Sequence, residues 1–140
     1  MNSVGSLQQA IGKGYFVVCL SVKLVAMEFE AKQLLRMYMG EQAKHHHRPF
    51  YEVIIAEAKA KGIAGATVFK GVLSYGMSGT VHTAKILELS QSLPMIIEIM
   101  DTEERIGEFL PVIESLARES GVHVHVTLEE VRSTVILPGK

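Results

Sequence analysis

The apolar pattern that most limits the fold of this chain is a strand, a helix and a strand, occurring twice in succession. The first set consists of an alternating stretch at residues 34–39, a stretch with helical spacing at 50–61 that stops at Gly62, and a β-branched stretch at 66–73. The second set begins at residue 94 and repeats this order. Two such units predict an α+β, ferredoxin-like (split βαβ) fold, in which an antiparallel sheet carries both helices on one face.

The second helix has clear end signals in the sequence. Residues 94–100 predict the strand before it, and Asp101 with Glu104 predicts a capping box at its start. Gly121 follows the last apolar position of the helical pattern, so we expect the helix to end there.

The remaining strands are less sharply delimited. We expect strands at residues 84–89, 123–127 and 131–137, with a turn at 128–130 between the last two. One face of the predicted sheet has no helix to cover it. Its apolar positions, such as those within residues 35–39, predict self-association through the sheet.

The composition is that of a soluble globular protein. Hydrophobic residues make up 48% and charged residues 21% of the 140 residues, which suits one domain. The net charge of -1 gives no general attraction to nucleic acid or to an anionic membrane. The single cysteine, Cys19, excludes an intrachain disulfide and suits a reducing compartment, so we expect a cytoplasmic protein.

The N-terminal residues differ in character from the rest of the chain. The apolar run at residues 15–20 is broken by Lys23, and it is shorter than the ~20 apolar residues that a transmembrane helix needs. We therefore expect no membrane insertion. We interpret residues 1–28 as a flexible or over-extended segment, with Met27 as the natural start, and residues 29–140 as a single domain.

The stretch at residues 62–83 carries the most distinctive chemistry. It stops a helix, forms a strand, and ends in a loop where glycines alternate with hydroxyl side chains and an imidazole. Backbone N–H groups at glycines can approach an anion closely. The residues that we expect to bind a small ligand are Arg36, Lys70, Gly71, Tyr75, Gly76, Ser78, Gly79, His82 and Thr83.

Two plainer interpretations of this stretch remain open. The glycines fit a mobile loop with positive φ angles equally well, and their spacing matches no Walker or Rossmann pattern. His82 fits a structural histidine bonded to a neighbouring carbonyl as well as it fits a ligand contact.

The histidines are a second candidate. His45, His46 and His47 are adjacent, and His123 and His125 share one face of a predicted strand. Imidazoles suit zinc, copper and nickel, but adjacent loop residues rarely all point at one ion, and the strand pair lacks a third ligand. We therefore predict no metal site, and interpret these histidines as a solvated loop and a polar strand face.

Six blocks of sequence succeed one another in an order and at spacings that resemble a known family. They are LLRMYMGE (34–41), RPFYEVI (48–54), GIAGATVFKG (62–71), HTAKIL (82–87), LPMIIEIMD (93–101) and VTLEEV (126–131). They resemble the PII-like family catalogued as domain of unknown function 190, over about residues 30–135. The resemblance implies a homotrimer related in fold to PII nitrogen regulators and CutA proteins. In PII proteins, adenine nucleotides bind between subunits beside a long loop after the second strand.

One connection departs from the PII pattern. PII proteins carry a phosphate loop rich in glycine and lysine between the third core strand and the second helix, whereas residues 100–105 here (MDTEER) are short and acidic. The phosphates of a bound nucleotide would then lie at residues 70–83. Ser78 and Thr83 would bond them, and Tyr75 and His82 would contact the base or ribose.

These observations lead to one expected function and two alternatives. We expect a non-enzymatic sensor that binds an adenine nucleotide (ADP, ATP or AMP) and signals to a membrane transporter or an enzyme. The alternatives are a CutA-like metal-binding protein and a trimeric adaptor that needs no small ligand.

Overall fold

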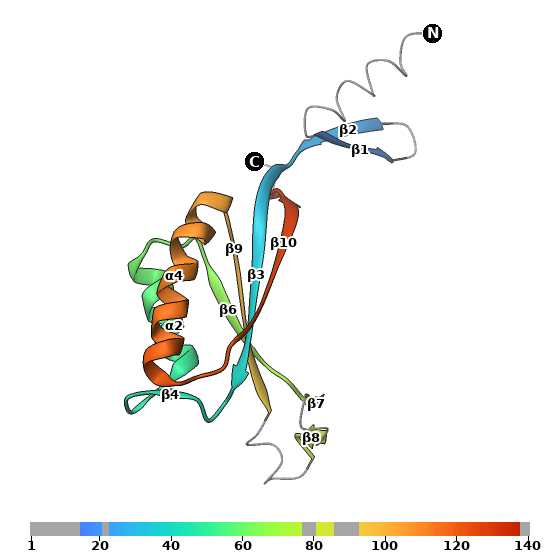
Figure 1. Cartoon of the computed structure of the whole chain (residues 1–140). Helices are drawn as coiled ribbons and strands as arrows, with labels where there is room; N and C mark the ends of the chain where they lie inside the picture. Colours follow the sequence, from blue (N-terminus) through green and yellow to red (C-terminus); the bar gives the residue numbers. More distant parts are fainter. Residues whose placement is uncertain (1–14, 21–22, 77–80, 86–92, 138–140) are drawn as a thin grey trace. The chain divides into compact units, whose positions relative to one another are not determined.

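The computed structural model describes residues 15–20, 23–76, 81–85 and 93–137 (Figure 1). The chain forms two compact units, which are described separately. Residues 33–129 make the larger unit, and residues 1–32 with 130–140 make the smaller one.

The six main elements occur in the predicted order. They are β3 (Glu30–Gly40), α2 (Phe50–Ala60), β6 (Ala66–Lys70), β9 (Pro94–Asp101), α4 (Glu103–Ser120) and β10 (His125–Ser133). The strands form one sheet in the order β10-β3-β9-β6, and β9 pairs antiparallel with both β3 and β6. Both helices lie on the same side of the sheet (Figure 1). The α+β, ferredoxin-like fold is therefore confirmed.

Among the described residues, shorter strands form three separate hairpins. In the smaller unit, β1 (Tyr15–Leu20) pairs antiparallel with β2 (Lys23–Glu28). In the larger unit, β4 (Lys44–His45) pairs with β5 (Arg48–Pro49), directly before α2. The third hairpin, β7 (Leu73–Tyr75) with β8 (Val81–Thr83), follows β6. No helix within the described ranges is long and apolar enough to span a membrane.

The core lies between the sheet and the helices. Every second residue of β3 is buried there, so Leu35, Met37 and Met39 pack beneath the helices. The apolar side chains that complete the core come from β9 and both helices, and they include Met95, Ile97, Ile99, Phe50, Ile54, Ile106, Phe109 and Ile113.

The helix-free face differs from its predicted form. The apolar residues at 35, 37 and 39 lie under the helices, so they are not available for self-association. The helix-free face carries Leu34, Arg36 and Tyr38 from β3 instead. Because β9 faces β3 in register, Glu98 lies opposite Arg36, and Ile96 lies opposite Tyr38 on this same face.

The start of α4 also differs from its predicted form. Thr102 is the N-cap, and its Oγ1 accepts a hydrogen bond from the Arg105 N–H at 3.3 Å. Asp101 is buried at the end of β9, and it accepts bonds from the N–H groups of Ala64 at 2.9 Å and Thr102 at 2.7 Å. The predicted capping box at Asp101 was wrong because this carboxylate holds the loop before β6. The helix ends as expected at Gly121, whose φ of 64° is left-handed.

The predicted turn at residues 128–130 was wrong as well. β10 runs without interruption from His125 to Ser133. Glu129, in the middle of that segment, receives a hydrogen bond from Arg36. The strand expected at residues 66–73 is divided into β6 and β7. Of the strand expected at 84–89, only the first two residues are described, and they form a turn after β8.

Candidate functional site

The stretch predicted to bind a ligand forms the β7–β8 hairpin. This hairpin follows β6, the second strand of the core fold, at the lower end of the sheet in Figure 1. Ser78 and Gly79 lie outside the described residues. The paired residues are Leu73 with Thr83, Ser74 with His82, and Tyr75 with Val81.

Gly71 joins the core sheet to the hairpin through a close backbone approach. Its N–H donates to the Pro94 carbonyl at 2.9 Å. A Cβ at this position would lie 3.0 Å from Cγ of the Pro94 ring, so a side chain would displace the ring. Among the described glycines, positive φ angles occur at Gly62 and Gly121, so neither Gly71 nor Gly76 serves a left-handed turn. Gly71 is therefore explained by packing against the start of β9.

The two faces of the hairpin are chemically different. One face carries Ser74 and His82, which are both half-buried. The other carries Leu73, Tyr75 and Val81, which are 66%, 75% and 51% exposed. Successive side chains of a strand point to opposite faces. Tyr75 and His82, which were expected to contact one base or ribose together, therefore lie on opposite faces.

His82 is the polar residue of the hairpin with an unmet hydrogen-bonding requirement. Its Nδ1 atom is buried and has no hydrogen-bond partner among the described residues. An unsatisfied buried polar atom costs about 1–3 kcal/mol. A further group that bonds this nitrogen would therefore be stabilising, which makes the His82 face the part of the hairpin best suited to a polar ligand.

Two other residues that were predicted to bind the ligand, Lys70 and Thr83, are already engaged. The Lys70 ammonium lies 2.9 Å from a carboxylate oxygen of Glu41, which follows β3 directly. The Thr83 hydroxyl oxygen accepts a hydrogen bond from the Lys85 N–H at 3.3 Å. Glu41 could not be predicted from the sequence, because its contact with Lys70 depends on where β3 and β6 end in space.

Arg36 does not belong to the hairpin. Its Nε donates to Glu98 at 2.6 Å, and its Nη1 donates to Glu129. The hydrogen bond with Glu98 raises the pKa of Arg36 above its ordinary value, and Glu129 adds to this effect. Arg36 lies on the helix-free face of the sheet. Lys70 lies opposite the core residue Met95 in the strand pairing, and therefore on the helix-covered face. The guanidinium therefore neutralises the carboxylates of Glu98 and Glu129. The structure does not bring it to the predicted ligand-binding residues of the hairpin.

Two of the three adjacent histidines lie beside a carboxylate. One ligand atom from each of His45, His46 and Glu119 falls within 4.8 Å of the other two. His47 is exposed and outside this group. His125 packs against the Tyr38 ring, with 5.8 Å between the ring centroids.

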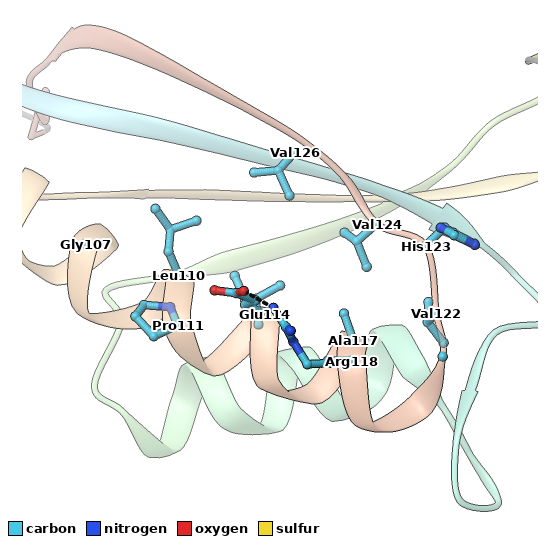
Figure 2. Close-up of a pocket in the computed structure, with 12 residues that line it drawn as sticks. Gly107, Leu110, Pro111, Glu114, Ala117, Arg118, Val122, His123, Val124 and Val126 are labelled. Carbon is cyan, nitrogen blue, oxygen red and sulfur yellow. Dashed lines mark hydrogen bonds and ion pairs between the residues drawn. The ribbon is translucent and has the colours of Figure 1, made fainter.

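A groove of about 780 Å³ runs between α4 and the segment that leads into β10. Figure 2 shows Leu110 and Val126 pointing into it, while Glu114 and Arg118 form an ion pair at 2.5 Å across one turn of the helix. Its surface is mainly apolar, and it contains none of the residues predicted to bind a ligand. Its charged side chains, Glu114 and Arg118, are bonded to each other. The hairpin is therefore better suited than the groove to bind a polar ligand.

Comparison with known proteins identifies the family. The model of the DUF190 family, described as uncharacterized ACR, matches residues 32–133. The chain belongs to the DUF190 family. A UPF0166 protein of Aquifex aeolicus is 36% identical over 105 residues, covering 75% of this chain and 95% of that protein. A UPF0166 protein of Methanocaldococcus jannaschii is 38% identical over 90 residues, covering 64% and 82%.

Solved structures of PII-like proteins share the fold of this DUF190 chain. CPII from Thiomonas intermedia K12, bound to ADP, AMP and bicarbonate, has a TM-score of 0.53 at 16% identity, covering 76% of this chain and 92% of that one. A PII-like signaling protein from Thermus thermophilus has a TM-score of 0.57 at 14% identity, covering 76% and 93%. The PII-like fold expected from the sequence is therefore confirmed.

Proposed function

We propose that this DUF190 protein is a non-enzymatic, PII-like sensor that binds an adenine nucleotide at the β7–β8 hairpin and regulates a transporter or an enzyme in the cytoplasm. The observation that carries the proposal is the buried Nδ1 of His82, which has no partner among the described residues. CPII, which shares the fold, is bound to ADP and AMP, and this supports an adenine nucleotide as the ligand class.

The ligand is proposed to bind on the hairpin face that carries His82 and Ser74. An imidazole and a hydroxyl can bond the ribose or a phosphate, and Ser78, Gly76 and Gly79 would supply further donors. Lys70 would exchange its bond with Glu41 for one with a phosphate, because a phosphate carries more negative charge than a carboxylate.

The opposite face of the hairpin is proposed to contact the regulated protein. Leu73, Tyr75 and Val81 together expose an apolar surface, as expected of a docking site. Ligand bound on one face would favour one hairpin conformation, and this would change how the other face fits its partner. Subunits of the proposed homotrimer would associate through the helix-free face of the sheet, where Phe69 and Met100 are 47% and 42% exposed.

Isothermal titration calorimetry with ADP, ATP and AMP tests this proposal. Wild-type protein should bind at least one of them, and His82→Ala should weaken that binding by about 10–100-fold, the equivalent of one hydrogen bond to a charged group. His123→Ala is the matched control, since His123 is an exposed histidine remote in sequence from the hairpin. Its affinity should equal that of wild type.

Two outcomes would contradict the proposal. Equal affinities of wild type and His82→Ala would place the nucleotide elsewhere. Absence of binding by all three nucleotides would favour a ligand-independent adaptor, for which the exposed apolar face of the hairpin is the specific support.

A further inference from the structure

The β4–β5 hairpin brings two imidazoles to the C-terminal end of α4. His46 and His47 form the two-residue turn of this hairpin, and His45 is the last residue of β4. His46 has a φ of 54°, in the left-handed region that histidine enters more readily than most residues. This backbone change at His46 gives the side chains of His46 and His47 different directions.

α4 supplies the groups that surround these two imidazoles. His45 Nδ1 lies 2.6 Å from the Ser120 hydroxyl, and His46 Nε2 lies 3.6 Å from a carboxylate oxygen of Glu119. The two rings are in edge contact, with their centroids 4.4 Å apart. The three possible ligand atoms of His45, His46 and Glu119 all lie within 4.8 Å of one another.

We propose that His45, His46 and Glu119 bind a divalent transition-metal ion, for which zinc has the best-suited chemistry. Two imidazoles and one carboxylate, with a position left for water, form a familiar zinc ligand set. Ligands at about 2.0–2.2 Å from a tetrahedral zinc ion lie about 3.4 Å apart. The three ligand atoms lie within 4.8 Å of one another, so a contraction of at most about 1.4 Å closes the group. His46 and Glu119 are exposed, and their side chains can make this movement.

Ser120 completes the site as a positioning residue. In the tautomer in which His45 Nδ1–H donates to the Ser120 hydroxyl oxygen, this bond fixes the plane of the ring and leaves the Nε2 lone pair for the ion. The third ligand was not apparent from the sequence, because it comes from a helix more than 70 residues further along the chain. The adjacent histidines do not form this site by themselves. It forms because α4 brings Glu119 close to them.

The neighbouring charges set the expected strength of binding. Arg118 is paired with Glu114, whereas Arg48 lies opposite His45 in the β4–β5 pairing. The positive charge of Arg48 opposes a cation, and two of the three ligands are exposed to water. We therefore expect reversible binding in the range of an exposed site, weaker than that of a buried structural zinc site.

Titration with zinc, followed by calorimetry, tests the proposal on the full chain. His46→Asn removes the imidazole and keeps a residue that tolerates a positive φ, and Glu119→Gln removes the charge at constant shape. Each should weaken zinc binding at least 10-fold, since the loss of a supporting residue alone typically costs 10–100-fold. His47→Asn makes the same change at the neighbouring turn position, and it should leave the affinity unchanged.

Cobalt(II) gives a second readout that does not depend on stability. Wild-type protein should develop the visible absorption of a four- or five-coordinate cobalt ion, and Glu119→Gln should lose it. The proposal would be overturned if His46→Asn and His47→Asn lost equal metal affinity, or if Glu119→Gln kept full affinity. Either result would show that the ion binds the histidine run alone. Absence of zinc binding by wild-type protein would overturn it too.

Discussion

Asp101→Ala is expected to lower the free energy of unfolding by about 3 kcal/mol, because each hydrogen bond to a charged group contributes about 1.5–3 kcal/mol. The carboxylate is 4% exposed, and it receives bonds from the backbone N–H groups of Ala64 and Thr102. Alanine would leave both donors without a protein acceptor, at the point where the loop before β6 meets the start of α4. Urea denaturation at a fixed protein concentration measures the change.

Two further variants distinguish this role from helix capping. Asp101→Asn keeps one acceptor oxygen, so it should lose about half as much stability as Asp101→Ala. Glu104→Ala removes an exposed acidic side chain from the first turn of α4, and it should cost only about 0.3–1 kcal/mol through the helix dipole. If Glu104→Ala lost more stability than Asp101→Ala, this would support the capping box predicted from the sequence.

Phe109→Ala is expected to lower the free energy of unfolding by about 3–5 kcal/mol, the usual cost of deleting a buried aromatic ring. The side chain is 1% exposed and lies on the face of α4 that packs into the core, together with Ile106 and Ile113. Since small domains are stable by only about 5–15 kcal/mol, this variant should be close to unfolding. Thermal or urea denaturation measures the loss.

A graded series keeps this test informative where alanine prevents folding. Phe109→Leu retains most of the apolar volume and should lose roughly a third of the stability that Phe109→Ala loses. Ser115→Ala, at an exposed position of the same helix, should change the stability by no more than about 0.5 kcal/mol. Equal stabilities of Phe109→Leu and wild type would contradict the placement of this ring in the core.

The order of the core elements could be predicted from the sequence because it rests on local patterns. Alternation placed Leu35, Met37 and Met39 on one face of a strand, and the structure buries them together. Gly62 and Gly121 ended the two helices at left-handed positions, which glycine adopts readily. Patterns of this kind are visible within a few residues, so they need no knowledge of the tertiary structure.

The errors arose where distant segments determine local structure. Residues 128–130 resemble a turn, but Glu129 lies in a continuous strand and bonds Arg36, which is 93 residues away in sequence. Asp101 resembles a cap, but it bonds Ala64 across 37 residues. In both cases a tertiary partner determines the role of a charged side chain, and local spacing does not identify that partner.

The candidate site could be predicted only in part for the same reason. The sequence indicated the hairpin region and His82, while the opposite orientations of Tyr75 and His82 follow from the strand pairing. The proposed metal group depends on α4 reaching the β4–β5 turn. Sequence adjacency drew attention to the three histidines, but their relation to Glu119 required the fold.

The most direct test of the central proposal is the change in backbone amide NMR shifts when ADP is added to isotope-labelled protein. Binding at the hairpin predicts the largest shifts at the amides of β7 and β8 and at Lys70 and Gly71, with a second set in Glu41 as Lys70 changes partner. Shifts concentrated along the α4 groove of Figure 2, or none at saturating ADP, would contradict the proposal.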